Sequence, residues 1–502
     1  MLNVFWKKLK SGSDIRGSAV STFEGENIEL SNEIVEKISY AFSSWLSKKF
    51  NLAYTNISVA IGHDSRLSAL RIKNVVINSL RSIGITVYDC SLATTPAMFM
   101  AVSALQCTAS ISITASHLSY EKNGFKFFVP EGGLSSQHIE EILELAQKDE
   151  PIISSKTGSV RSVNLMNHYS TKLKNMIENN LGNKLPLKGL KIVVDAGNGA
   201  GGFFASEVLK PLGADVSCST CLAPDGNFPV HAPNPEDKKA LNYVANATKN
   251  ANADIGIIFD TDVDRVSIID SEGHQIAGTR LIALVASIVI RSSEQNIIVT
   301  DSMTHESLRA FIAKLGGYQF RYKRGYNNVI SMAKKINEKG GNCPLAIETS
   351  GHAAFKENNF MDDGAYLACK IIIELMNLRS NNRTLQDCTK DLVVPNGEFD
   401  TRISLLEPED ALKIMQDLKR HVDSNKNVVL DKENFEGIRI HFPAKHQNGW
   451  VIIRESLHDA KLVVHAESYV LGGIKSIGTF IKGFLKKYKF KDDISSGSFS
   501  SF

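Results

Sequence analysis

The stretch DIGIIFDTDVDR, residues 254–265, decides the class of fold. It begins with a nearly continuous apolar run, which is typical of a strand buried on both faces of a sheet. Directly after this run come Asp260, Asp262 and Asp264, and a loop at the carboxyl end of a strand can turn such alternate carboxylates toward one cation. Hard oxygen ligands of this kind favour Mg²⁺. A solvated acidic turn would explain a lone Asp-x-Asp, but the third Asp and the adjacent Arg265 favour a metal site.

The same organisation recurs on both sides of this stretch. Short apolar, β-branched runs end in small or polar residues and are followed by segments with helical patterns, such as residues 68–83. The runs are residues 57–62, 191–195, 254–259 and 296–300. Buried strands that alternate with helices are typical of α/β layers, so the sequence predicts an α/β fold with mostly buried sheets.

Three changes of character suggest domain boundaries. A polar, Asn/Lys-rich stretch covers residues 172–187, and a helical pattern begins at residues 278–280. After residues 393–397 the strands alternate apolar and charged positions, as half-buried antiparallel strands do. We expect three α/β domains and a smaller C-terminal α+β domain. Their predicted bounds are 1–182, 183–280, 281–395 and 396–502.

Composition excludes several classes of protein. The 502 residues are 43% hydrophobic and 22% charged, close to the average of soluble globular proteins. A net charge of +3 gives no reason to expect a nucleic-acid or membrane partner. No apolar stretch is long enough to span a membrane, and lysines at positions 7 and 8 come too early for a signal peptide. We expect a cytoplasmic enzyme, either a monomer or a homodimer.

The seven cysteines are scattered and odd in number. Cys218 and Cys221 form one C-x-x-C, but no second pair stands at the spacing of a zinc site. We interpret the cysteines as reduced thiols of a cytosolic protein.

A second chemical feature is the run Thr114-Ala115-Ser116-His117, with Lys126 a few residues later. A serine between small and polar neighbours, beside a histidine and near a lysine, can serve as a nucleophile or a phosphate acceptor. A Ser-His pair is also common in ordinary loops. The G-x-S-x-G elbow of serine hydrolases is absent, so the sequence gives no support for that chemistry.

Two further clusters follow apolar runs. Glu348, Ser350 and His352 place a carboxylate, a hydroxyl and an imidazole within five residues, which could bind adjacent sugar hydroxyls or simply cap a helix. Arg454 and Ser456 follow a strand and offer the donors that a phosphate needs.

In this order and spacing the four clusters resemble those of the α-D-phosphohexomutase superfamily, most closely its phosphomannomutase/phosphoglucomutase branch. The resemblance runs from about Ser11 to Glu467. Supporting matches are GSDIRG at 12–17, GHDSR at 62–66 and DGNFPVHAPNPE at 225–236. The resemblance implies three related mixed α/β domains around a central cleft and a C-terminal domain like the TATA-binding protein.

The resemblance also implies roles for the residues of the first two clusters. Ser116 would hold the phosphoryl group, and Asp260, Asp262 and Asp264 would bind one Mg²⁺ per chain together with a phosphoserine oxygen of Ser116. Arg265 would lie beside the phosphoserine or the substrate.

The remaining roles concern proton transfer and substrate binding. Lys126 and Arg16 match positions proposed for proton transfer or charge stabilisation, and His117 lies beside the nucleophile. The matches to the sugar loop and to the last phosphate loop imply substrate contacts. Glu348 and Ser350 would bind the O3 and O4 hydroxyls with His352 close by, and Arg454, Ser456 and His458 would bind the phosphate that is not reacting.

The activity that the resemblance implies is that of an isomerase, an intramolecular phosphotransferase. It would interconvert the 1- and 6-phosphates of mannose, glucose or both, with a hexose 1,6-bisphosphate as intermediate and activator. A phosphoglucosamine mutase and a non-catalytic sugar-phosphate-binding relative stay open as alternatives, although Thr349 stands where the former tend to carry Gln. Two departures from the family pattern are Leu118-Ser119 in place of Asn-Pro, and residues 324–326, where a proton-transfer histidine is expected to be missing.

Overall fold

The computed structural model describes residues 2–23, 25–149, 156–291, 296–407, 409–445, 447–456 and 460–491. The chain forms two compact units. The first consists of Met1–Ala277 with Ser350–Asp387, and the second of Gly278–Thr349 with Cys388–Phe502. Residues 281–395, predicted as one domain, therefore contribute to both units. No helix in the described ranges has both the length and the hydropathy of a membrane span.

The first unit begins with an eight-stranded sheet of order β1-β2-β6-β5-β3-β4-β8, in which β7 pairs with β6. β3 is parallel to β4 and β5, whereas β6 is antiparallel to β5. The strands are β1 (Lys10–Ser11), β2 (Asp14–Ser18), β3 (Ser58–His63), β4 (Thr86–Leu92), β5 (Ala109–Ile113), β6 (Lys122–Val129), β7 (Gly132–Gly133) and β8 (Val160–Ser162). The helices of this region are α1 (Val4–Leu9), α2 (Asn32–Phe50), α3 (Ala69–Ser82), α4 (Thr95–Ala104) and α5 (Ser136–Lys148).

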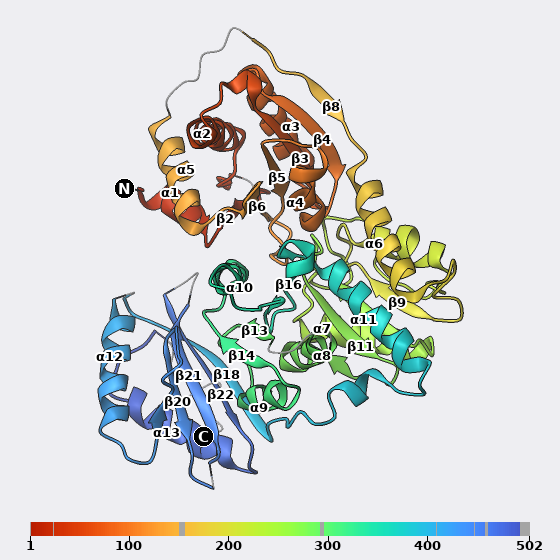
Figure 1. Ribbon diagram of the computed structural model, residues 1–502. Coiled ribbons are helices and arrows are strands. Elements are labelled where there is room, and N and C mark those ends of the chain that lie inside the picture. Colours follow the sequence, from red (N-terminus) through yellow and green to blue (C-terminus); the bar gives the residue numbers. More distant parts are fainter. Residues whose placement is uncertain are drawn as a thin grey trace. The chain divides into compact units, whose positions relative to one another are not determined.

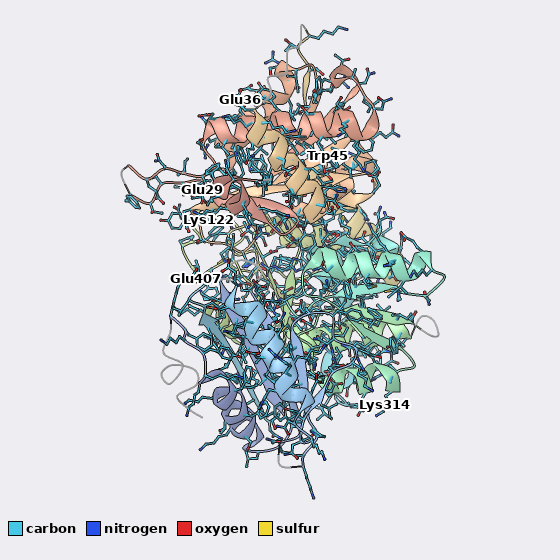
Figure 2. The ribbon with its side chains drawn as sticks, turned by 90° about the vertical axis from the view of Figure 1, so that its left-hand side faces the viewer. Glu29, Glu36, Trp45, Lys122, Lys314 and Glu407 are labelled. Atoms are coloured by element: carbon cyan, nitrogen blue, oxygen red, sulfur yellow. The ribbon has the colours of Figure 1, made fainter. Side chains whose placement is uncertain are left out.

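Helix α2 shows how these helices attach to the core. The Ser31 side chain caps its first turn by accepting a hydrogen bond from the amide of Ile34. Glu36 is exposed, whereas Trp45 is buried and donates from Nε1 to Glu141 at 2.9 Å (Figure 2). The apolar side of α2 joins residues of α3, α5 and the central strands in one hydrophobic cluster, so the amphipathic pattern fixes its orientation.

The second sheet of this unit has the order β12-β11-β10-β9. Its elements are β9 (Ile192–Asp195), α7 (Lys238–Asn250), β10 (Ile255–Phe259), β11 (Val266–Asp270) and β12 (Gln275–Ile276). The unit is completed by α6 (Leu165–Leu181), β16 (Ala353–Phe355), β17 (Met361–Asp362) and α11 (Gly364–Arg379). The polar stretch 172–187, predicted as a boundary, is helical as far as Leu181 and packs against α11, because Leu173 and Ile177 bury an apolar stripe.

The second unit contains a parallel set β14-β13-β15 and a five-stranded antiparallel sheet of order β18-β22-β21-β20-β19. The first set comprises α8 (Gly278–Ile290), β13 (Ile297–Thr300), α9 (Glu306–Lys314), β14 (Tyr318–Arg321), α10 (Tyr326–Glu338) and β15 (Leu345–Ile347). The second comprises β18 (Gly397–Ser404), α12 (Asp410–Asp423), β19 (Val429–Leu430), β20 (Ile438–Phe442), β21 (Gly449–Glu455), β22 (Lys461–Ser468) and α13 (Gly473–Leu485). Both α12 and α13 share one hydrophobic cluster with this sheet, drawn in blue in Figure 1.

The prediction of half-buried C-terminal strands is confirmed for β18, where Glu398, Asp400 and Arg402 are exposed, but it is wrong for β20 and β21, which are buried on both faces. Arg439 on β20 is almost fully buried, and its guanidinium lies 3.3 Å from the centre of the Trp450 ring. It donates to the carbonyls of Ser302 at 2.8 Å and Thr304 at 3.2 Å. A charged residue at an alternating position is therefore buried here, because backbone carbonyls and an aromatic ring replace its solvent.

One arrangement occurs three times, although no linear repeat is visible in the sequence. β5, β10 and β15 each pair in parallel with an earlier strand, namely β3, β9 and β13. The loops after β5, β10 and β15 begin at Thr114, Asp260 and Glu348. The carboxyl end of a parallel strand thus carries each of the first three chemical clusters.

Candidate active site

The loop after β5 holds Ser116 in a left-handed backbone conformation, with φ of +51°. Its amide donates to Oγ1 of Thr114 at 2.9 Å, and that hydroxyl donates to Oδ2 of Asp64 at 2.7 Å. A serine rarely adopts this conformation, so neighbouring contacts must hold it.

Arg66 supplies most of those contacts. Its buried guanidinium donates to four backbone carbonyls of the loop, at distances between 2.5 and 2.9 Å. The acceptors are Ser116, Leu118, Ser119 and Lys122. Its Nε donates to Asp64 at 3.2 Å. Burial raises the pKa of Asp64 to about 6 against the opposing effect of Arg66. The motif at 62–66 was identified in the sequence, but the role of Arg66 was not predicted. The Asp-x-Arg pattern of Asp64 and Arg66 was the feature that could have indicated it.

The loop between β10 and β11 carries the three aspartates. Asp260, Asp262 and Asp264 are all buried, and one carboxylate oxygen of each lies within 4.8 Å of the other two. Between them Val263 adopts φ of +65°, an uncommon conformation for a β-branched residue, and its carbonyl accepts from the amide of Gly364 at 3.0 Å. The structure therefore turns the three carboxylates toward one point, as the spacing predicts.

Two buried cations face this cluster. Lys126 contacts Asp264 and lies 3.2 Å from Asp262, while Nε of Arg265 donates to Asp260 at 3.1 Å. Burial and the neighbouring carboxylates raise the pKa of Asp260 well above its usual range. Burial opposes ionisation of Asp264 as well, but Lys126 and His352 outweigh it and hold the pKa of Asp264 well below its usual range.

Ser116 lies where the two loops meet. Its Oγ donates to Oδ2 of Asp260 at 2.8 Å and accepts from Nη2 of Arg265 at 3.2 Å. Nδ1 of His117 lies 3.3 Å from the same oxygen. Burial lowers the pKa of His117, so the charged imidazolium is disfavoured beside Arg265. A single hydroxyl thus contacts an acidic and a cationic group of the other loop.

The carboxylates fit a hard divalent cation. Oδ1 of Asp262 and Oδ1 of Asp264 are buried and accept no hydrogen bond within the described chain. Buried carboxylate oxygens are costly unless they are paired or bind a metal, and an all-oxygen set suits Mg²⁺. Thr95, which sequence reasoning missed, donates from Oγ1 to Oδ2 of Asp262 at 2.5 Å and from its amide to the Asp262 carbonyl at 2.9 Å.

The other predicted residues of the first unit are placed as follows. Arg16 donates to Asp14 at 2.8 Å on β2. Nε2 of His352 lies 3.5 Å from Oδ1 of Asp264, and its Nδ1 lies 2.9 Å from Oγ of Ser350. His352 is therefore next to the aspartate loop, a contact that the sequence did not indicate.

In the second unit, Glu348 follows β15 and is buried. Its Oε1 accepts from the amide of Gly325 at 2.6 Å, immediately before α10. Gly325 has φ of +114°, which only glycine adopts readily. At the position where the sequence predicts a missing histidine, the backbone thus supports Glu348. Burial and Glu348 raise the pKa of the adjacent Asp301 to about 7.

Arg454 and Ser456 belong to the last loop. Nε of Arg454 forms an ion pair with Oε1 of Glu436 at 3.5 Å. The other carboxylate oxygen of Glu436, Oε2, accepts a hydrogen bond from the amide of Arg324 at 2.9 Å. The amide of Ser456 donates to the carbonyl of Lys461 at 2.8 Å. Glu436 was missed by sequence reasoning, since it lies in a polar loop without a motif. His458 lies outside the described residues.

Comparisons with known proteins agree on one family. Family models of phosphoglucomutase/phosphomannomutase match residues 7–152 (alpha/beta/alpha domain I), 167–273 (domain II) and 277–395 (domain III). A phosphomannomutase/phosphoglucomutase of Pseudomonas aeruginosa is 30% identical over 439 residues, which cover 87% of this chain and 89% of that protein.

Two solved structures share the fold. A phosphoglucomutase/phosphomannomutase family protein of Burkholderia thailandensis superposes with a TM-score of 0.79 at 24% identity, covering 98% of this chain and 100% of that one. An N-acetylphosphoglucosamine mutase of Aspergillus fumigatus, in complex with GlcNAc-6P and magnesium, has a TM-score of 0.59 at 12% identity and covers 97% and 99% of the two chains.

Proposed function

Because this chain belongs to the phosphoglucomutase/phosphomannomutase family, we propose that it is a phosphohexomutase that interconverts hexose 1-phosphate and hexose 6-phosphate. The hexose is mannose, glucose or both, and the reaction passes through a phosphoserine at Ser116 and a hexose 1,6-bisphosphate. The observation that carries the proposal is the pair of hydrogen bonds from Ser116 Oγ to Asp260 and from Arg265 to Ser116 Oγ.

The chemistry of this step is displacement at phosphorus. The bond between the phosphoryl group and Ser116 Oγ breaks while a bond to a sugar hydroxyl forms, and a general base takes the hydroxyl proton. The second half-reaction returns the other phosphoryl group to Ser116. Arg265 is within hydrogen-bond distance of the oxygen that gains charge when the first bond breaks, so it can stabilise that charge.

The buried charges support phosphoryl transfer. Three buried aspartates face the two cations Lys126 and Arg265 beside Ser116. Mg²⁺ bound by the aspartates would supply positive charge that stabilises the transferring group. Because Lys126 forms ion pairs with Asp262 and Asp264, we assign it charge stabilisation rather than proton abstraction.

Substrate recognition in this proposal involves the loop after β15 and the last loop of the chain. Glu348 and Ser350 bind the O3 and O4 hydroxyls, which glucose and mannose share because they differ only at C2. Arg454 and Ser456 bind the distal phosphate through charge-assisted hydrogen bonds. The pairing of Arg454 with Glu436 at 3.5 Å keeps its guanidinium oriented without a close hydrogen bond between the two.

The decisive test is intact-protein mass spectrometry before and after incubation with glucose 1,6-bisphosphate. We expect the gain of one phosphoryl group, mapped by fragmentation to Ser116, and no gain in Ser116→Ala. Ser119→Ala is the matched control, because the exposed Ser119 lies in the same loop but donates from Oγ to Glu121 at 2.6 Å. Turnover by Ser116→Ala near the wild-type rate, or phosphate on another residue, would contradict the proposal.

Substrate class needs a separate measurement. We expect wild-type kcat/KM to be similar for glucose 1-phosphate and mannose 1-phosphate and lower for glucosamine 1-phosphate. Glu348→Gln should impair both hexoses together, since an anionic acceptor for hydroxyls is weakened. A strong preference for glucosamine phosphate would replace the substrate but keep the phosphoserine mechanism.

A further inference from the structure

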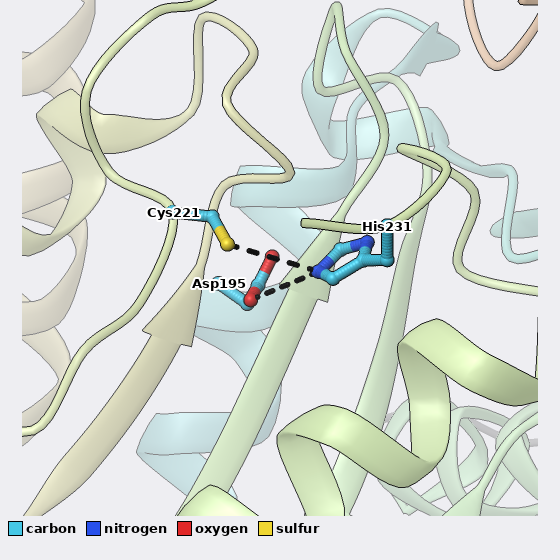
Figure 3. A group of neighbouring side chains, drawn as sticks. All are labelled: Asp195, Cys221 and His231. Atoms are coloured by element: carbon cyan, nitrogen blue, oxygen red, sulfur yellow. Dashed lines mark hydrogen bonds and ion pairs between the residues drawn. The ribbon is translucent and has the colours of Figure 1, made fainter. Parts of the chain in front are cut away.

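A second group of ligand atoms lies at the carboxyl end of β9. Asp195 is the last residue of this strand and is fully buried, while Cys221 and His231 come from the long connection to α7 (Figure 3). One ligand atom of each residue lies within 4.8 Å of the other two. β9 pairs in parallel with β10, with Asp195 opposite Ile258, so this group follows the strand next to the aspartate loop.

The geometry of His231 distinguishes chelation from a catalytic relay. Nε2 of His231 lies 3.2 Å from Oδ2 of Asp195 and 3.9 Å from Sγ of Cys221, and both dashed lines in Figure 3 meet at this nitrogen. In a nucleophile–histidine–carboxylate triad the carboxylate and the nucleophile bond opposite ring nitrogens. Here Nδ1 is occupied by the carbonyl of Ala232 at 2.8 Å. The thiol, carboxylate and imidazole therefore converge instead of forming a relay.

We propose that Asp195, Cys221 and His231 bind one borderline-soft divalent transition-metal ion, of which Zn²⁺ is the representative, with water as the fourth ligand. Ligand atoms at about 2.0–2.3 Å from a tetrahedral Zn²⁺ lie about 3.3–3.6 Å apart. The observed separations of 3.2 and 3.9 Å from Nε2 need only small side-chain rotations to meet this geometry. The three-ligand set with one open position is typical of exchangeable zinc sites.

The surroundings of the three ligands are those of a metal site. Oγ1 of Thr220 donates to Oδ2 of Asp195 at 2.6 Å, and the amide of Gly197 donates to its Oδ1 at 2.8 Å. The Ala232 carbonyl accepts from Nδ1–H of His231, which leaves the Nε2 lone pair facing the thiol and the carboxylate. Such outer contacts fix ligand orientation and tautomer. Without a metal, a proton on Nε2 satisfies the same position, so metal binding must release it.

This site and the aspartate loop differ in ligand softness. The loop after β10 offers only oxygen, which suits Mg²⁺, whereas thiolate and imidazole select zinc-like ions over Mg²⁺. The segment after β9 and the aspartate loop are connected by a hydrogen bond from the amide of Ala200 to the carbonyl of Thr261 at 2.8 Å. Because the two sites differ in ligand softness, excess Mg²⁺ can occupy the aspartate loop while a transition metal is titrated into the second site.

The test is a titration of the full-length protein with Co²⁺, after chelation and reduction, in millimolar Mg²⁺. We expect a thiolate-to-cobalt charge-transfer band that saturates at one equivalent and disappears when Zn²⁺ is added. Cys221→Ser should lose the band, and His231→Gln should weaken Co²⁺ binding at least about 10-fold. Cys218→Ser is the matched control: Cys218 shares the C-x-x-C but is exposed and outside the cluster, so this variant should keep the band.

A second measurement uses the wild-type protein alone. Zn²⁺ at one equivalent should protect Cys221 from alkylation, while Cys218 continues to react. A wild-type band that is absent, a band that survives in Cys221→Ser, or alkylation of Cys221 that Zn²⁺ leaves unchanged would overturn the proposal. None of these results bears on phosphorylation of Ser116, so this inference and the mutase proposal fail separately.

Discussion

Two clusters of this chain each bring acidic ligand atoms within 4.8 Å of one another, but their carboxylates have different hydrogen-bond partners. In the second unit, ligand atoms of Glu306, Asp431 and His441 lie within 4.8 Å of one another. Arg321 donates to Asp431 and to Glu306 at 2.9 Å each, and Arg439 donates to Glu306 at 3.1 Å. This cluster is an ion-pair network whose carboxylates are already paired with arginines.

The aspartate loop of the first unit is different. Lys126 and Arg265 also contact its carboxylates, but Oδ1 of Asp262 and Oδ1 of Asp264 accept no hydrogen bond from the described chain. The three carboxylates of the loop converge because Val263 adopts a positive φ. The other cluster is assembled from separate elements: Glu306 begins α9, Asp431 directly follows β19, and His441 lies on β20. Between these two clusters, the buried carboxylate oxygens that accept no hydrogen bond from the described chain are what indicates a hard-cation site in the aspartate loop.

The largest expected effect tests this distinction directly. Asp262→Asn removes one negative charge from the three-aspartate loop. We therefore expect kcat to fall by about 10²–10³-fold and the dependence of turnover on Mg²⁺ concentration to weaken. The measurement is turnover of glucose 1-phosphate against Mg²⁺ concentration. Asp431→Asn in the arginine-filled cluster is the control and should leave that dependence unchanged. Wild-type activity that survives in EDTA would contradict the assignment of the aspartates.

The same comparison applies to the arginines. Arg321 and Arg439 each donate closely to a carboxylate, whereas Arg454 lies 3.5 Å from Glu436 without a hydrogen bond. Arg454→Ala should raise KM for every phosphosugar by about 10–100-fold, because charge-assisted hydrogen bonds to the distal phosphate are lost, and should change kcat less. The exposed Arg420→Ala on α12 is the control. An effect on kcat alone would place Arg454 at the reacting phosphate instead.

Local patterns predicted much of this fold. The apolar runs at 57–62, 254–259 and 296–300 correspond to strands β3, β10 and β13. Short apolar runs rich in β-branched residues and bounded by polar residues favour a buried strand over a helix. The polar stretch 172–187 continues helix α6 as far as Leu181, because the buried Leu173 and Ile177 pack this part of the helix. Polarity alone misled at Arg439, whose partners come from a distant segment.

The site divides in the same way. The three aspartates are close in sequence, so their convergence could be predicted from spacing alone. Arg66 reaches the Ser116 carbonyl across 50 residues, and Thr95 reaches Asp262 across 167. Such contacts depend on how strands are ordered in the sheet, which local periodicity does not determine. Sequence patterns therefore indicated no positioning role for Arg66 and no sign of Thr95, whereas they placed the three aspartates and Ser116 in motifs.

A smaller effect is expected at the buried Arg66, most of whose hydrogen bonds go to backbone carbonyls. Arg66→Lys cannot keep four carbonyl hydrogen bonds, since lysine lacks the planar guanidinium. We expect kcat to fall about 10-fold with little change in KM, because the φ of Ser116 is no longer held and its oxygen is displaced from Asp260 and Arg265. The rate of Ser116 phosphorylation by glucose 1,6-bisphosphate should fall in parallel. Arg71→Lys, which loses similar bonds to the carbonyls of Ala19 and Leu30, is the control.

The smallest effect concerns stability and not turnover, and it comes from the arginine-filled cluster. Burial opposes ionisation of Asp431, but His441, the Glu433 amide and Arg321 outweigh it and hold the pKa of Asp431 well below its usual range. A depressed carboxyl pKa contributes stability above the unfolded value of about 4, and this stability is lost as the pH falls below it. Asp431→Asn should therefore lower the melting temperature at pH 7 by about 1 °C for each kcal/mol lost, because the unfolding entropy scales with the 502 residues of the chain.

That difference should shrink as the pH falls from about 5 toward 3, because Asp431 then takes up a proton in the unfolded chain while the folded chain still holds it ionised. Differential scanning fluorimetry across this range measures it, with the exposed Asp423→Asn on α12 as the control. Glucose 1-phosphate turnover by Asp431→Asn at pH 7 should match the wild type. If Asp431→Asn instead lost Mg²⁺-dependent activity as Asp262→Asn does, carboxylate oxygens without hydrogen bonds would not distinguish a metal site from an ion-pair network in this protein.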